Sequence, residues 1–166
     1  LVTLGEQRAD PARPGGPQLL ANLGTLGSLS VAGPPEQVAA TVRAMVYELG
    51  LGEHLSNAFV TTVGFTIGDA EQLDRVSRRS EEEALQLARE AVERQQRADH
   101  RLGPRELEVL VVRTEHTNLN AFLDLAGRRS GLALIVAGDV RSSRIGARFV
   151  LADDGTGRFP GIDVPL

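Results

Sequence analysis

Apolar residues along this chain form short runs that alternate with segments of helical spacing. Four runs are rich in β-branched or other apolar residues and are typical of buried strands: 28–32, 58–65, 107–112 and 131–137. Elsewhere, apolar residues recur every three or four positions, which predicts helices over 35–49, from the Ser80 region onward and over 118–126, with a short helical piece over 70–76. This alternation predicts a mainly parallel sheet covered by helices on both faces.

Residues at the helix ends support these assignments. Pro35 suits the first position of a helix, and Gly50 and Gly52 are expected to end the helix that it begins. Ser80 and Glu83 have the spacing of a capping box, in which each side chain satisfies a backbone N–H of the other residue. A helix is therefore expected to begin immediately after Ser80.

Turn signals near both ends of the chain predict antiparallel hairpins at the edges of the sheet. The apolar runs 1–4 and 18–23 flank a loop rich in Pro and Gly, and Asp153-Asp154-Gly155 separates 147–151 from 158–159. Residues 162–166 are a candidate for a last strand. The predicted fold class is α/β: a three-layer α/β/α domain spanning 1–166, which we expect to be a piece of a longer protein because it begins with Leu1.

Composition excludes several kinds of chemistry. The 166 residues contain no Cys, which excludes disulfides, thiolate metal sites and cysteine nucleophiles, and all 18 basic residues are Arg. The net charge of −4 argues against a dedicated nucleic-acid surface. No apolar run reaches the roughly 18 residues that a membrane span requires. The three histidines, His54, His100 and His116, lie in separate segments without metal-ligand spacing, so no metal site is expected.

The strand at 28–32, Gly33 and the following helix start occupy the place where a nucleotide-binding protein would have its phosphate loop. Counting from Gly33, that motif would need Gly, Lys and Ser or Thr where this chain has Val38, Ala39 and Ala40. No lysine occurs anywhere in the chain.

The residues that follow Gly33 are equally unsuited to phosphate. Pro34 and Pro35 lack a backbone N–H, and Glu36 adds negative charge where the anion would sit. We therefore treat Gly33, Pro34, Pro35 and Glu36 as a degenerate phosphate-loop position and expect no cofactor.

Ligands of parallel α/β sheets bind outside the carboxyl ends of the strands. The residues predicted to gather there are Asp69, Arg113, Glu115, His116, Asp139 and Arg141. Arg113 occupies the position where an NTPase strand would carry its Mg²⁺-binding carboxylate, and Glu115 is the nearest substitute. The mixed charges give this crevice no evident preference for phosphate.

Arg75, Arg78 and Arg79 form a small basic cluster before the capping box. Such a cluster is usually a solvated loop; the alternative is a contact surface for a partner or an acidic ligand.

Several segments together resemble a type of actinobacterial protein. They are Leu1-Val-Thr-Leu-Gly5, 27–33, 38–49, 58–65 and 130–139. The resemblance is to multidomain proteins that combine membrane helices, a LysM peptidoglycan-binding module and a bacterial transcriptional activator domain, and it implies a cytoplasmic location, with tethering to the membrane through other parts of the full-length protein. More distantly, the segments resemble the P-loop ATPase domains of FtsK-type DNA translocases and type VII secretion motors. Val38, Ala39, Ala40 and Arg113 depart from those relatives where motor chemistry requires a match.

Three functional hypotheses follow. The first is a non-catalytic regulatory or interaction module of a larger membrane-linked transcriptional regulator, with other domains of the same protein or a protein as partner, no direct contact with nucleic acid and no membrane insertion by this domain. The second is a sensor of a small molecule or nucleotide that uses Arg113, Arg141 or Arg144 as its cations. The third is an enzyme using Glu115, His116 and Asp139, although their spacing does not require them to converge.

Overall fold

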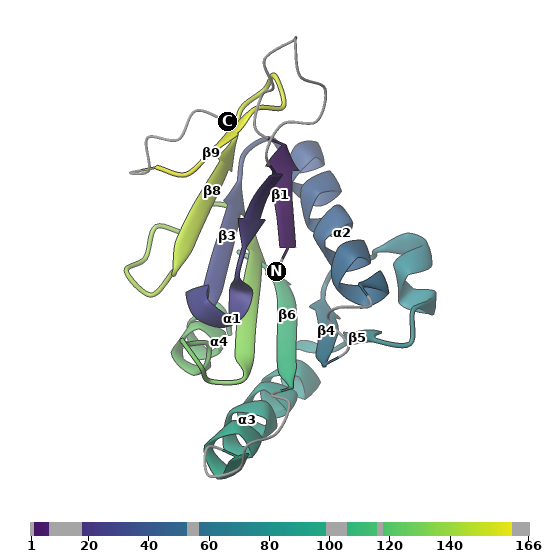
Figure 1. Ribbon diagram of the computed structural model, residues 1–166, viewed down its shortest axis with the longest axis vertical. Helices are drawn as coiled ribbons and strands as arrows, with labels where there is room; N and C mark the ends of the chain where they lie inside the picture. The colour runs from purple at the N-terminus through teal and green to yellow at the C-terminus, as the bar shows by residue number, and fades with distance from the viewer. Residues whose placement is uncertain (1, 7–17, 53–56, 99–105, 116–117, 161–166) are drawn as a thin grey trace.

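The computed structural model describes residues 2–6, 18–52, 57–98, 106–115 and 118–160. Its centre is a seven-stranded sheet formed by β3 (Ser28–Ala32), β4 (Ala58–Val63), β5 (Val76–Arg79), β6 (Leu107–Arg113), β7 (Leu132–Ala137), β8 (Ala147–Leu151) and β9 (Gly157–Arg158). The strand order is β5-β4-β6-β7-β3-β8-β9, and every neighbouring pair is parallel except β8 with β9 (Figure 1). The predicted α/β class is confirmed.

Helices cover both faces of this sheet. The long helix α2 (Pro35–Leu51) packs on one face, and α3 (Glu81–Ala98) and α4 (Leu119–Leu125) pack on the other. Because successive side chains of a strand point to opposite faces, Val109 and Val111 of β6 lie in the core beneath α2, whereas Leu110 and Val112 lie in the core beneath α3 and α4. None of the helices in the described ranges combines the length and hydrophobicity needed to cross a membrane.

The helix ends agree with most of the sequence prediction. Helix α2 begins at Pro35, but it continues through Gly50 and ends at Leu51, where the Gly52 N–H donates to the Glu48 carbonyl at 2.9 Å. The capping box before α3 is present: the Ser80 N–H donates to Glu83 Oε2 at 2.9 Å, and the Glu83 N–H donates to Ser80 Oγ at 3.3 Å. Gly50 therefore weakens the last turn of α2 without ending it.

The two hairpins differ in their relation to the main sheet. Strands β8 and β9 pair antiparallel at its edge, as predicted. Strands β1 (Val2–Glu6) and β2 (Gln18–Ala21) also pair antiparallel, but they form a separate two-stranded sheet, with β1 against α2, followed by the short helix α1 (Leu23–Leu26) (Figure 1). The expected strand over 162–166 lies outside the described residues.

The segment before the capping box differs from the prediction. Instead of a helical piece over 70–76, the chain forms a 3₁₀ helix, η2 (Gly68–Gln72), and then the edge strand β5. Only Val76 of β5 is buried, so the strand lacks the alternation of apolar and polar residues that would predict it. Arg78 and Arg79 of the basic cluster are therefore part of the sheet edge and not of a loop, whereas Arg75 lies in the turn before the strand.

The connection between β7 and β8 is an extended crossover, residues 138–146, rather than a helix. These strands are parallel and lie on either side of β3, so the nine residues must pass over a face of β3. Two buried serines of β3 hold the crossover in place. Ser30 Oγ donates to the Gly138 carbonyl at 2.7 Å and accepts from the Val140 N–H at 3.3 Å, while Ser28 Oγ donates to the Arg144 carbonyl at 3.1 Å and accepts from the Gly146 N–H at 2.9 Å.

Candidate functional site

The strand order places the predicted crevice at the carboxyl ends of β3 and β7. These strands are neighbours, and the connections that leave them cover opposite faces of the sheet: α2 follows β3, and the crossover 138–146 follows β7. A ligand site of an open α/β sheet is expected at such a point. Residues 33–36 lie at the end of β3 and Asp139 at the end of β7, whereas Arg113 ends β6, the next strand along.

The space beside Gly33 is filled by the end of β8. Only two residues, Gly33 and Pro34, connect β3 to α2, whereas a phosphate loop needs several more to wrap around its ligand. The φ angle of Gly33 is +142°, and a Cβ atom at this position would lie 2.7 Å from the Leu151 carbonyl oxygen and 2.8 Å from the Leu151 Cβ. Glycine is needed here so that the backbone can pack against Leu151.

The first turn of α2 offers few donors to an anion. Pro35 has no N–H, and the Val38 N–H already donates to the Pro34 carbonyl at 2.9 Å. The Gln37 side chain donates from Nε2 to the Asp153 carbonyl at 3.0 Å, which ties this turn to the β8–β9 hairpin. Glu36 is exposed and places a carboxylate at the same helix end.

Arg113 is held by partners of its own. Its guanidinium lies 4.8 Å from the centroid of the Phe65 ring, and Nη1 lies 3.3 Å from Glu115 Oε1. Hydrogen bonding by its own backbone amide and the nearby Arg113 guanidinium lower the pKa of Glu115. A cation at the end of β6, stacked on an aromatic ring, would repel the Mg²⁺ that an NTPase binds there.

Asp139 belongs to a second group of ion pairs. Its carboxylate lies 2.7 Å from Arg148 Nε and 3.2 Å from Arg141 Nε, and the hydrogen bond from Arg148 is the main reason that its pKa is lowered. Arg144 pairs with Asp124 of α4 at 2.8 Å. The structure thus brings Asp139 together with Arg141, but it pairs neither of them with Arg113 or Glu115.

The remaining predicted residues do not complete a site. Asp69 is exposed in η2, after β4, and β6 and β7 separate β4 from β3. His116 lies outside the described residues. Within the ranges that the structure describes, no three carboxylate or histidine side chains converge as metal ligands would.

A line of polar side chains that the sequence does not predict crosses β5, β4 and β6, on the face covered by α3. Ser77 Oγ lies 3.1 Å from Thr61 Oγ1, which donates to Glu108 Oε1 at 2.9 Å. Glu108 is buried, and this burial raises its pKa, against the opposing influence of the Thr61 hydrogen bond and of Arg94 and Arg79. The only signal in the sequence is a single Glu inside the apolar run 107–112, which resembles a surface position of a strand.

The raised pKa of Glu108 predicts a pH dependence of stability. Folding favours the protonated form of Glu108. Its contribution to the free energy of unfolding is therefore fully present below the unfolded-state pKa and is lost as the pH rises through the folded-state pKa. Glu108→Gln keeps an acceptor for Thr61 and removes the titration. We expect the melting temperature of the wild type, relative to that of the variant, to fall as the pH is raised from acidic to neutral; parallel pH profiles of the two proteins would contradict this.

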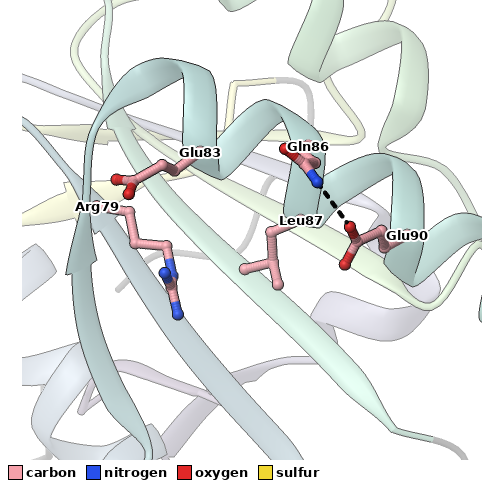
Figure 2. Close-up of a pocket in the computed structure, with 5 residues that line it drawn as sticks. All are labelled: Arg79, Glu83, Gln86, Leu87 and Glu90. Atoms are coloured by element: carbon pink, nitrogen blue, oxygen red, sulfur yellow. Dashed lines mark hydrogen bonds between the residues drawn. The ribbon is translucent and has the colours of Figure 1, made fainter.

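A pocket lies near this polar line, between the end of β5 and α3. It has a volume of about 240 Å³ and is lined by Arg79, Glu83, Gln86, Leu87 and Glu90 (Figure 2). The four α3 residues recur at helical spacing; Glu83 lies beside Arg79, and Gln86 and Glu90 point toward one another. No predicted crevice residue contributes to this pocket.

Comparison with known proteins identifies a solved structure with a similar fold. No protein-family model and no curated protein sequence matches the chain. Among solved structures, the chain is similar to Thermomonospora curvata EccC (ATPases 2 and 3), determined in complex with a signal sequence peptide, with a TM-score of 0.66 and 16% sequence identity. The alignment covers 90% of this chain and 35% of the EccC chain, so this chain spans about a third of that protein. At this identity the similarity shows the fold alone: a mainly parallel α/β domain like that of a type VII secretion ATPase.

Proposed function

We propose that this chain is a non-catalytic interaction or regulatory module that keeps an ATPase-like fold and has lost nucleotide binding. The observation that carries this proposal is the connection from β3 to α2, in which two residues replace a longer phosphate loop and Gly33 packs against Leu151 of β8. The absence of lysine from the chain and the position of Arg113 at the end of β6 support the same conclusion.

Protein or peptide recognition is the role that best suits such a module. The solved EccC structure is a complex with a signal sequence peptide, and about a third of that EccC chain aligns with this fold. A domain without a phosphate cradle retains the surfaces of its sheet edges and helices. We therefore assign its partner to another domain of the same protein or to a separate protein.

The kind of full-length protein that contains this domain is inferred from the resemblance of the sequence to actinobacterial LysM and transcriptional activator proteins. In that setting the domain belongs to a larger membrane-linked transcriptional regulator and works on its cytoplasmic side. The sequence of the full-length gene tests this directly: a LysM module and an activator domain on the flanks support the assignment, and their absence contradicts it.

Nucleotide titration is the sharpest test of lost binding. We expect ATP, ADP and GTP, each with Mg²⁺, to give no heat of binding in isothermal titration calorimetry. A ligand present at a hundred times its dissociation constant stabilises a protein by about 2.7 kcal/mol, so even weak binding would raise the melting temperature by several degrees. We expect no shift, and a micromolar dissociation constant would overturn the proposal.

The alternative of an arginine-based sensor has less support. Arg113, Arg141 and Arg144 each have a carboxylate partner, which a ligand would have to displace. The enzyme hypothesis is also weaker, because Glu115 and Asp139 are engaged in separate ion pairs. Thermal shift with a panel of nucleotides and cofactors would support the sensor if one compound stabilised the protein.

A further inference from the structure

Strand β5 ends the main sheet and leaves one backbone edge open. Its other edge pairs with β4, and no strand among the described residues pairs with its outer side. The Arg75 carbonyl accepts from the Val60 N–H at 2.8 Å. Because backbone direction alternates along a strand, the N–H and C=O of Ser77 also point toward β4, whereas those of Arg78 point outward. An open edge of this kind is a template for an added strand.

Two arginines at this edge point to opposite faces. Ser77 contacts Thr61 on the α3 side of the sheet, so Arg79 lies on that side as well. Val76 packs in the core beneath α2, so Arg78 lies on the α2 side. Both arginines are exposed, and neither forms an ion pair or a hydrogen bond with a residue that the structure describes.

The pocket beside β5 holds one cation, Arg79, whose charge also lowers the pKa of Glu83 and opposes the rise in the pKa of Glu108, although it forms no ion pair with a residue that the structure describes. Glu83 is engaged by the Ser80 cap, and Glu90 Oε1 accepts from Gln86 Nε2 at 3.1 Å. The Arg79 guanidinium, which extends beneath α3 in Figure 2, donates no hydrogen bond to a residue that the structure describes. A volume of about 240 Å³ lies below the range typical of small-molecule sites and suits a single side chain.

We propose that the β5 edge binds an extended peptide segment of a protein partner that carries two adjacent acidic residues. The segment adds a strand through the outward N–H and C=O of Arg78. Adjacent side chains of an added strand point to opposite faces, so one carboxylate enters the pocket and pairs with Arg79, while its neighbour pairs with Arg78. This inference rests on the proposed function and names the surface and the chemistry of its partner.

The charge of the edge selects this occupant over a second copy of the chain. Pairing two β5 edges would bring the arginines of one copy against those of the other, and like charges on directly opposed strands are unfavourable. The carboxylates of an acidic strand would instead be attracted to Arg78 and Arg79. Leu87 at the pocket wall gives the methylene groups of the acidic side chain an apolar contact.

The test uses a fluorescein-labelled peptide of sequence Thr-Val-Asp-Glu-Val-Thr and fluorescence anisotropy. We expect Arg79→Ala to weaken binding about tenfold or more, because it removes a charge-assisted hydrogen bond. Arg89→Ala, which removes an exposed arginine of α3 outside the pocket, is the matched control and should bind like the wild type. Replacing Asp-Glu of the peptide by Asn-Gln should weaken binding to the wild-type protein. The Arg79→Glu protein should prefer a peptide that carries Lys-Lys instead of Asp-Glu.

A second peptide tests the backbone pairing separately from the charges. N-methylation at alternate residues removes the N–H groups that an added strand needs while keeping both carboxylates, and we expect it to abolish binding. Equal binding of wild type and Arg79→Ala, equal binding of the methylated peptide, or no binding of the parent peptide would overturn this inference. The nucleotide titration is a separate test. Binding of a nucleotide would overturn the proposed function, whereas a protein that binds neither nucleotide nor peptide would overturn only the proposal for the β5 edge.

Discussion

We expect Gly33→Ala to lower the free energy of unfolding by about 3 kcal/mol and the melting temperature by roughly 6–12 °C. Two effects add at this position. The φ of +142° is strained for any residue with a Cβ atom, and the new methyl group would collide with the backbone oxygen and the Cβ of Leu151, neither of which is the end of a flexible side chain. Thermal and denaturant unfolding measure the change.

Gly155→Ala is the matched control for the backbone strain alone. Gly155 also has a positive φ, +81°, but a Cβ atom there would meet nothing within 4 Å. We expect that variant to lose only about 1 kcal/mol. If the two variants lost equal stability, the contact between Gly33 and Leu151 would be loose, and the principal argument against a phosphate site would be lost.

The second large effect is expected for the crossover 138–146. Ser30→Ala leaves the Gly138 carbonyl and the Val140 N–H without their buried partner, and Ser28→Ala does the same to the Arg144 carbonyl and the Gly146 N–H. An unsatisfied buried polar group costs about 1–3 kcal/mol, so we expect Ser30→Ala, whose partners are half-buried, to lose about 2 kcal/mol. The partners of Ser28 belong to exposed residues that water can reach, so we expect Ser28→Ala to lose about 1 kcal/mol and the double variant about 3 kcal/mol. Denaturant unfolding gives these values.

Hydrogen exchange provides a local measurement of the same effect. We expect the amides of Val140 and Gly146 to exchange faster in the variants, because their acceptor is gone. Ser142→Ala is the control: its hydroxyl is exposed, and a change within about 0.5 kcal/mol is expected. Unchanged or increased stability of Ser30→Ala would show that the serines fill space in the core and do not hold the crossover.

Much of the architecture follows from local sequence pattern. The apolar runs of β3, β6 and β7 and the helical spacing of α2 and α4 depend on neighbouring residues, so periodicity predicts them. The same holds for the capping box of Ser80 and Glu83 and for the lack of a phosphate-loop lysine. These features are readable because each depends on residues within a few positions of one another.

The tertiary structure alone decided the features that join distant segments. The contact of Gly33 with Leu151, the ladder from Ser77 through Thr61 to Glu108, and the passage of the crossover over β3 each depend on strand order, which no local pattern encodes. Strand β5 escaped prediction for a related reason: an edge strand with one buried residue is held by its pairing with β4 and not by its own hydrophobicity. The sequence by itself therefore determined most of the elements and the lack of a phosphate-loop lysine. Only the fold decided that Leu151 packs against Gly33 and that Arg79 is exposed on the edge strand β5, because both result from which strands become neighbours.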